Sequence, residues 1–374
     1  MIRLLFVFLF INTFAVSAQT LKTRNVVIVT LDGYRWKELF CGADPNILFN
    51  DKYVNDTSVV HQFWHEQEEQ RRRKLMPFMW NVIGTKGQLY GNRKYGNRMR
   101  LANMSLYSYA GYAEMFVGFA DRRTRKNDAK VNPNHTVLET IKNQPEFRGD
   151  VAAFATWGVM PYILREEISE IPVNAGNDQA TTLPLTDTEH ALNALTEEGR
   201  RAYGDRDDSV TFLYAFEYVK KKRPRVLYIS FGETDEHAHD GRYDDYLKSA
   251  HRTDSMLSVL WTWLQSQEQY RDQTTLIIAT DHGRGTSASG WRRHALLFRG
   301  SRQTWLAVMG PDTPPSGEMV NKQLIRQKQL AATIAAFLSV PYTNRRKPGD
   351  VIHTVFQDER LPETDSESWD SARR

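Results

Sequence analysis

The stretch Thr275–Gly285, TLIIATDHGRG, sets a buried strand directly before two side chains that can bind a metal. Residues 276–279 are apolar or β-branched, which is typical of a strand covered on both faces. Asp281 and His282 follow immediately. Ligands bind at the carboxyl ends of strands in open α/β sheets, and an adjacent carboxylate and imidazole can hold one divalent cation. The alternative is a turn with a capping aspartate and a solvated histidine.

Two other strands are expected to end in the same way. Asn25–Leu31, NVVIVTL, leads into Asp32 and a glycine. A buried aspartate is costly unless it is paired or binds something, although an aspartate that starts a turn is the simpler interpretation. Residues 225–231, RVLYISF, lead into Asp235 and His239. These two are four residues apart, so they share one face if the segment is helical.

Ser108 precedes a helical pattern that continues through Glu114 to Phe119. Most serines in such a position cap the helix. The other interpretation is a nucleophile whose alkoxide is stabilised by helix amides and metal ions. Ser105 is a competing candidate by position alone.

Strands and helices alternate along the whole chain, which predicts an α/β fold with a mostly parallel sheet covered by helices on both faces. Residues 164–188 lack a clear core pattern and are interpreted as an insertion, and residues from about 344 onwards as a polar tail. The further elements expected are helices at 58–83, 137–142, 209–221, 246–265 and 324–338, and strands at 151–156 and 305–309.

The composition is that of an ordinary globular protein. The 374 residues are 41% hydrophobic and 25% charged, with a formal net charge of +4. This length predicts a large core in residues 19–374, organised as a single α/β domain with insertions or as two sub-domains. The mild basic excess gives no reason to expect binding to a nucleic-acid duplex, and no segment of the mature chain is apolar enough to predict a transmembrane helix.

Residues 1–18 match a secretory leader, with Arg3 before an apolar stretch and a small-residue cleavage site at Val16-Ser17-Ala18. The chain has a single cysteine, Cys41, so it cannot form an internal disulfide. Exported animal proteins of this size usually carry several. The expectation is therefore an exported bacterial protein, periplasmic or secreted.

The order of these motifs resembles the alkaline phosphatase superfamily, and within it the type I phosphodiesterase/nucleotide pyrophosphatase branch. The similarity covers roughly residues 25–340. It rests on VTLDG ending at Gly33, the Ser108 segment, Asp-x-x-x-His from Asp235 to His239, Thr-Asp-His-Gly at residues 280–283 and the later His294. Each motif is weak alone, but five in the family's order make a specific signal.

The resemblance implies a ligand set for two divalent cations. One metal would be held by Asp32, Ser108, Asp281 and His282, and the other by Asp235, His239 and His294. Mixed carboxylate and imidazole ligands suit zinc, with manganese as the alternative. Two cations about 4 Å apart can clamp the attacking and leaving oxygens of an in-line displacement. In this interpretation Ser108 attacks phosphorus, and Asn127 donates a hydrogen bond to a non-bridging oxygen.

The implied activity is a metal-dependent phosphoric ester hydrolase that acts on a small-molecule phosphate diester or monoester through a phosphoserine. The diesterase branch usually has threonine at the position of Ser108, which leaves the ester class open. Sulfatases share the fold but build a formylglycine from a Cys or Ser followed by x-Pro-x-Arg, and Ser108-Tyr109-Ala110 does not match. The alternatives are transfer of a phosphoryl or phosphoethanolamine group to an envelope acceptor, or a non-enzymatic surface protein with a remnant site.

Overall fold

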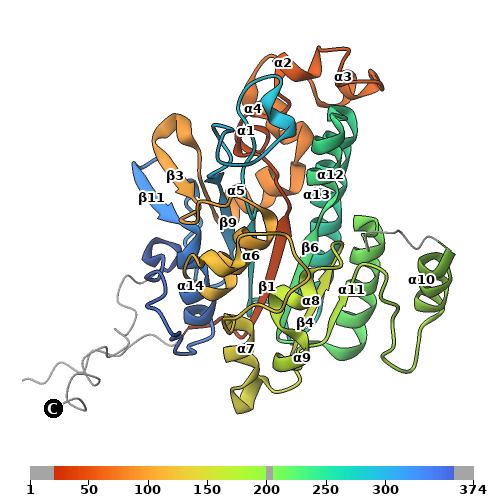
Figure 1. Cartoon of the computed structure of the whole chain (residues 1–374), viewed down its shortest axis with the longest axis vertical. Coiled ribbons are helices and arrows are strands. Elements are labelled where there is room, and N and C mark those ends of the chain that lie inside the picture. The colour runs from red at the N-terminus through yellow and green to blue at the C-terminus, as the bar shows by residue number, and fades with distance from the viewer. Residues whose placement is uncertain (1–20, 199–204, 358–374) are drawn as a thin grey trace, which may run out of the picture.

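The computed structural model describes residues 21–198 and 205–357 (Figure 1). The leader expected at residues 1–18 lies outside the described residues. The described chain forms a central sheet with helices packed on both faces, as the alternation of elements predicted. Among the described residues, no helix is long and apolar enough to cross a membrane.

The main sheet has eight strands in the order β10-β2-β9-β7-β1-β6-β4-β5. Its central strands β7, β1, β6 and β4 are all parallel, whereas β9 runs antiparallel to both of its neighbours. A second sheet, in the order β11-β3-β8, lies beside it. The strands are β1 (Asn25–Leu31), β2 (Gln88–Tyr90), β3 (Asn97–Arg100), β4 (Val151–Ala155), β5 (Val173–Ala175), β6 (Val226–Phe231), β7 (Thr274–Ala279), β8 (Gln303–Thr304), β9 (Leu306–Met309), β10 (Gly317–Glu318) and β11 (Gln323–Arg326).

The two faces of the sheet each build a core, because successive residues of a strand point to opposite faces. In β1, Val27 and Val29 face the core beneath α1, α4, α11 and α13, and Val26 and Ile28 face the core beneath α6, α7, α8 and α14. The helices are α1 (Trp36–Cys41), α2 (Pro45–Leu48), α3 (Ser58–Phe63), α4 (Glu68–Leu75), α5 (Gly84–Lys86), α6 (Ser108–Val117), α7 (Val137–Lys142), α8 (Met160–Leu164), α9 (Glu166–Ser169), α10 (Asp187–Glu198), α11 (Asp208–Lys222), α12 (Glu233–Asp240), α13 (Tyr243–Ser266) and α14 (Leu330–Phe337).

The single helix expected at 58–83 is wrong. The segment is divided into α3, α4 and a π-helical turn at Met79–Ile83. Pro77 causes the second break, because proline disfavours a helical conformation in the residue before it, and Met76 has φ −132° and ψ 73°. The first break follows Trp64, where the Nδ1 atom of His65 accepts a hydrogen bond from the backbone of Gln67 at 3.0 Å.

The helix expected at 324–338 is correct only from Leu330 onwards. Residues 323–326 form β11, whose backbone pairs with β3. The Gln329 side chain then accepts a hydrogen bond from the Arg326 backbone at 2.9 Å and helps to turn the chain into α14. Residues 164–188, interpreted as an insertion, include β5, which pairs with β4 at the edge of the main sheet.

Candidate functional site

The residues expected to bind metal are brought together at the carboxyl ends of β1, β6 and β7. These three strands are adjacent and parallel in the centre of the sheet. Asp32 directly follows β1, and Asp281 and His282 follow β7 within a few residues. Asp235 and His239 lie on α12, the helix that follows β6, so the condition under which the two residues share one face is met.

Asp32, Asp281 and His282 form the first group. One ligand atom of each lies within 4.8 Å of the others. The Nε2 atom of His282 is 3.3 Å from Asp32 Oδ1 and 3.5 Å from Asp281 Oδ2. Both of these carboxylate oxygens are buried and lack a hydrogen-bond partner in the described structure. Buried oxygens without a donor are costly, so they fit a cation that would occupy the space between them.

Ser108 adjoins this first group. It is the first residue of α6, after Tyr107 in extended conformation, and it is buried. Its Oγ atom is 3.2 Å from His282 Nε2. Ser105, the competing candidate, is half-buried, and its hydroxyl donates to the backbone oxygen of Arg125 at 2.8 Å. It therefore lies outside this group.

Asp235, His239 and His294 form the second group. His239 Nε2 lies 3.2 Å from Asp235 Oδ2 and 3.1 Å from His294 Nε2. The ring of His294 stacks on that of His282, with centroids 3.8 Å apart. His282 therefore stands between the two groups, and its Nε2 atom is also 3.7 Å from Asp235 Oδ1.

Backbone carbonyl groups orient the two buried histidines. His294 Nδ1 is 2.7 Å from the carbonyl oxygen of Leu106, and His282 Nδ1 is 3.1 Å from that of Gly283. A carbonyl oxygen only accepts, so each Nδ1 carries the proton and each Nε2 keeps a lone pair. Both lone pairs point into the site. This is the usual support for metal-binding histidines.

Burial and neighbouring charge govern the ionisation of the centre. Burial raises the pKa of Asp32 well above its usual value, and the charges of Asp281 and Asp235 raise it further. Burial and Asp235 likewise raise the pKa of Asp281. Burial lowers the pKa of His282, and the neighbouring His294 adds to this. The surroundings therefore oppose ionisation of Asp32 and Asp281, which a divalent cation would favour, and they keep His282 neutral, the form in which an imidazole binds metal.

Arg284 is a site residue to which the sequence interpretation gave no role. Its side chain is buried, its Nε donates to the Trp291 carbonyl at 2.8 Å, and its guanidinium pairs with Asp235. Burial alone would raise the pKa of Asp235, but Arg284 holds it well below its usual value. The signal was present in the sequence, because an arginine two residues after His282 in a buried segment needs a carboxylate partner.

Tyr112 is a second residue that the sequence interpretation left out of the site. Its hydroxyl donates to Asp32 Oδ2 at 3.1 Å and receives a hydrogen bond from Ser230. Asn127 lies differently from the rest of the expected set. It is exposed, and its Oδ1 atom accepts the backbone N–H of Tyr109 at 3.0 Å, which places its amide beside the start of α6.

Gly33 explains why a glycine follows Asp32. Its φ is +58°, which favours glycine. A Cβ atom there would lie 2.7 Å from Asp235 Oδ1 and 2.8 Å from an Arg284 nitrogen. The backbone N–H of Gly33 also donates to Asp281 Oδ1 at 3.0 Å. The missing side chain thus leaves room for the second group to approach the first.

Solved structures share this architecture. A putative sulfatase from Bacteroides thetaiotaomicron matches with a TM-score of 0.60 and 9% identity, over 91% of this chain and 76% of that one. The alkaline phosphatase PafA matches with a TM-score of 0.56 and 9% identity, over 91% of this chain and 100% of that one. The lipoteichoic acid synthase LtaP from Listeria monocytogenes matches with a TM-score of 0.50 and 11% identity, over 87% of this chain and 74% of that one. At this identity the likeness shows the fold alone, and that fold is the alkaline phosphatase-like one that the resemblance drawn from the sequence implied.

The chain belongs to the Sulfatase family, whose sequence profile matches residues 104–340, more than half of its length. No curated protein sequence matches it. The matched region begins just before Ser108 and includes both histidines of the Thr-Asp-His-Gly and His294 segments. Members of this superfamily are generally hydrolases of phosphate or sulfate esters, or group transferases of the same fold.

Proposed function

We propose that this protein is a two-metal phosphoester hydrolase in which Ser108 is the nucleophile. The observation that carries the proposal is the pair of unpartnered buried oxygens, Asp32 Oδ1 and Asp281 Oδ2, which face His282 Nε2 beside the Ser108 hydroxyl. Hydroxyl, imidazole and carboxylate groups in this arrangement are the parts that a metal-assisted displacement at phosphorus needs.

The residues divide between two divalent cations. Asp32, Ser108, Asp281 and His282 would hold one, and Asp235, His239 and His294 would hold the other. The donor set suits zinc, with manganese as the alternative. Bound there, the cations would supply positive charge to the attacking hydroxyl, the phosphate oxygens and the leaving oxygen. The Nε2 atoms of His239 and His294, which face each other at 3.1 Å beside Asp235, support the second position.

The chain's own groups would carry the remaining work. Ser108 stands at the amino end of the ten-residue helix α6, whose partial positive charge favours an alkoxide. Its Oγ atom would form a bond to phosphorus while the bond to the leaving oxygen breaks and that oxygen takes up a proton. Water would then hydrolyse the bond between Ser108 and phosphorus, restoring the hydroxyl and releasing phosphate from a monoester substrate or a phosphate monoester from a diester substrate. Asn127 would present its amide N–H to a phosphate oxygen, because its Oδ1 is already used by Tyr109.

Sulfate ester hydrolysis is disfavoured despite the family membership. The formylglycine motif expected of sulfatases is absent around Ser108, which is followed by Tyr109 and Ala110. We assign the substrate class as phosphate esters and place the protein outside the cytoplasm, as the leader at residues 1–18 predicts. Fractionation of expressing cells tests the second statement, with export lost on deletion of residues 1–18.

The test combines metal analysis with turnover. Wild type, Ser108→Ala and the matched control Ser105→Ala are assayed with nitrophenyl phosphate and bis(nitrophenyl) phosphate. Ser105 is three residues away and its hydroxyl faces the Arg125 carbonyl, so its loss should leave turnover intact. About two metals per chain, with activity lost only in Ser108→Ala, supports the proposal, and the better substrate identifies the ester class. Bound metal without hydrolysis would instead favour transfer to an acceptor, and absence of both would leave a remnant site.

A further inference from the structure

We propose that an arginine-lined pocket beside the loop at 102–107, which leads into Ser108, binds a second phosphate group of the substrate, remote from the ester that is cleaved. The substrate would then be a molecule with more than one phosphate. The pocket is a cavity of about 840 Å³ between the loop at 102–105 and the segments at 120–125 and 345–346. The assignment of the remote group to a substrate rests on the proposed function, but the binding of phosphate does not.

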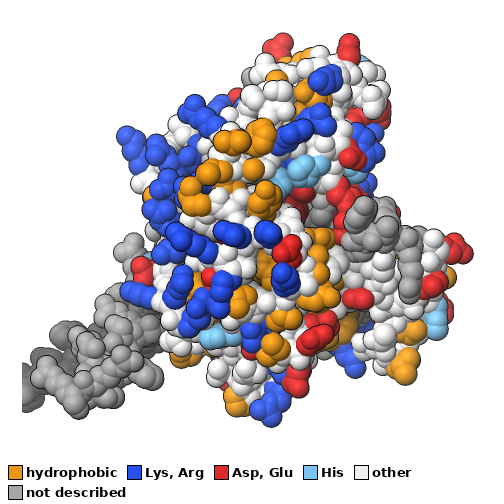
Figure 2. Space-filling model, in the orientation of Figure 1, with side chains coloured by type: hydrophobic (Ala, Val, Ile, Leu, Met, Phe, Trp, Pro, Cys, Tyr) orange, Lys and Arg blue, Asp and Glu red, His pale blue; other side chains and the backbone are white. Residues whose placement is uncertain are grey.

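The charge of this pocket is strongly one-sided. Five arginines line it, namely Arg122, Arg123, Arg125, Arg345 and Arg346, against a single carboxylate, Asp121. The excess of four positive charges equals the formal net charge of +4 for the entire chain. Figure 2 shows Lys and Arg side chains gathered over the side of this face that carries β3, β11 and α14. A mild overall charge therefore conceals a concentrated basic surface.

The arginines have different roles. Asp121 is already bound by Arg123 at 2.9 Å and by Arg345, and Asn134 donates to it at 2.9 Å. These two arginines are thus neutralised in part and hold the wall of the pocket. Arg122 and Arg125 are exposed, and no ion-pair or hydrogen-bond partner of either guanidinium occurs in the described part of the chain. They are the groups left to meet an external anion.

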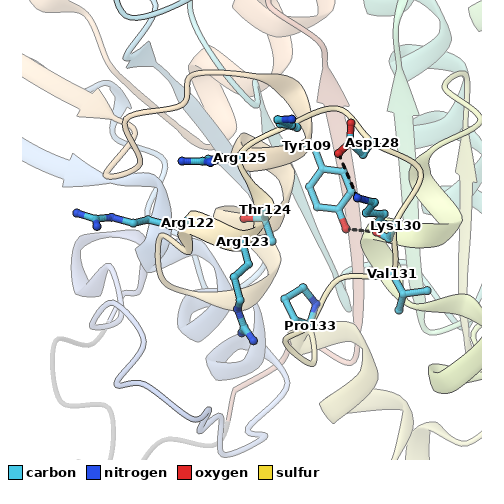
Figure 3. Close-up of a pocket in the computed structure, with 10 residues that line it drawn as sticks. Tyr109, Arg122, Arg123, Thr124, Arg125, Asp128, Lys130, Val131 and Pro133 are labelled. Carbon is cyan, nitrogen blue, oxygen red and sulfur yellow. Dashed lines mark hydrogen bonds and ion pairs between the residues drawn. The ribbon is translucent and has the colours of Figure 1, made fainter.

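A second hollow, of about 460 Å³, shares three arginines with this pocket. Arg122, Arg123 and Arg125 line both cavities, and Lys126 and Lys130 add to the smaller one. Figure 3 shows the guanidinium groups of Arg122 and Arg125 extending to one side, away from Tyr109. The guanidinium groups of both arginines therefore point away from the Tyr109 side of the smaller hollow.

The wall between the pocket and the catalytic centre is only one loop thick. Asn103 and Ser105 line the pocket, whereas the carbonyl of Leu106 accepts the hydrogen bond that orients His294. Ser108 follows two residues later. The loop at 102–107 thus joins the pocket to Ser108, and the inference requires a ligand that reaches across this loop.

This loop is rigidly supported. Leu106 has a φ of 60°, a conformation that is costly outside glycine. Asn103 Oδ1 holds it by accepting the Leu106 N–H at 3.0 Å. Asn103 is in turn held by the buried Glu114, which accepts from the backbone of Ala102 and Asn103 at 2.7 Å each. The support fixes the distance between the pocket and the nucleophile, as a site that recognises two ends of one ligand requires.

Phosphate is the chemistry that fits the unpartnered arginines. The planar guanidinium offers paired N–H donors that match phosphate oxygens, and these charge-assisted bonds are stronger than neutral ones. Such a phosphate can belong to a soluble multiply phosphorylated molecule or to a lipid headgroup that carries the ester at a membrane surface. Both sources share the same recognition, and the experiment separates them.

The test measures binding to Ser108→Ala protein, so that nothing is consumed. The probes are inositol hexakisphosphate, by calorimetry, and vesicles of phosphatidylcholine with phosphatidylglycerol, by sedimentation. In Arg122→Gln/Arg125→Gln we expect affinity to fall about tenfold or more, because two charge-assisted contacts are lost. Arg122→Lys/Arg125→Lys should restore part of it. The matched control is Arg148→Gln/Arg271→Gln, two exposed arginines that lie just before the amino ends of β4 and β7, whereas the catalytic centre lies at the carboxyl ends of the strands.

Loss of hexakisphosphate binding in the glutamine variant alone supports the pocket with a soluble ligand. Loss of vesicle binding in that variant alone supports it with a lipid headgroup. Equal affinity of the glutamine variant and the control for both probes overturns the inference. Hydrolysis of nitrophenyl phosphate by the wild type is measured separately, so failure of the proposed activity is distinguishable from failure of the pocket.

Discussion

The candidate metal centre and the arginine pocket are neighbours, but they differ in burial, in charge and in the elements that form them. The centre is buried, rich in carboxylate and imidazole groups, and fixed at the ends of three central strands. The pocket is exposed, basic, and built from loops at 102–105, 120–125 and 345–346. The ends of rigid strands can hold catalytic groups in fixed positions, whereas loops can change the recognition of a ligand from one relative to another. The difference implies that chemistry and substrate choice are separable in this protein.

Substitution of Asp281 with Ala should have the largest effect. It removes one of the two unpartnered oxygens and the acceptor of the Gly33 N–H. We expect phosphoester hydrolysis to fall about a thousandfold or more, as for loss of a direct catalytic group, together with a fall in bound metal. His294→Ala should behave alike. Steady-state rates and metal analysis of each variant check this, and wild-type activity in either one removes that residue from the ligand set.

Asp254 tests whether burial alone makes a carboxylate functional. It lies on α13 away from the centre, and both oxygens accept backbone N–H groups, from Phe78 at 2.7 Å and Met79 at 2.8 Å. Burial raises its pKa to about 7, although the two hydrogen bonds act to lower it. The folded state then binds the proton more tightly than the unfolded state, so stability is lost as pH rises from about 4 to about 7.

The corresponding measurement compares the free energy of unfolding of wild type and Asp254→Asn. From pH 5 to pH 8 the wild type should lose about 2–3 kcal/mol relative to the variant, because only the wild type must ionise a buried carboxyl group. Turnover at fixed pH should change little. A pH-independent difference between the two proteins would show that the Asp254 pKa is ordinary.

Arg284 combines a feature of each site, because it is an arginine, like the residues of the pocket, but lies inside the buried centre. Arg284→Met keeps the volume but removes the partner of Asp235. We expect metal affinity and activity at limiting metal to fall about 10- to 100-fold, as for groups that support ligands, and excess metal to restore part of the rate. Metal titrations of turnover measure this. An unchanged titration would mean that Arg284 serves packing against Trp291 only.

Asn127→Ala should have the smallest effect. The asparagine is exposed and belongs to a loop, yet its Oδ1 supports the start of α6. We expect kcat/KM to fall about tenfold, the equivalent of one lost hydrogen bond in the transition state. Asn127→Asp keeps the acceptor for Tyr109 but not the donor. Equal rates in Asn127→Asp and wild type would show that the donor is not used.

Much of the fold was readable in the sequence where one signal dominates. The β1 and β6 runs are mostly apolar and lie within one residue of their expected bounds. Asp235 and His239 lie on a helix, which is the condition under which their spacing puts them on one face. The failures occurred where a local pattern competed with a distant partner. Residues 323–326 have helical composition, but pairing with β3 makes them a strand.

The candidate site divides in the same way. Asp-His and Asp-x-x-x-His are local patterns that point to chemistry, so their members could be named. Arg284 and Tyr112 act through Asp235 and Asp32, which are distant in sequence, and no spacing rule connects them. The pocket was hidden for another reason, because Arg122 and Arg345 lie more than two hundred residues apart and net charge averages over the entire chain.

The long sequence separation between β1 and β6 affects how the protein matures. Thr30 pairs with Ser230, and Asp281 reaches back to the Gly33 N–H, 248 residues away. The central strands therefore assemble only after most of the chain has been synthesised, which makes folding slow. One cation held by Asp32 and Asp281 would cross-link the ends of β1 and β7, and a second held by Asp235 would lie beside it after β6. Metal uptake would then be the final step of folding, and chelation would lower the melting temperature.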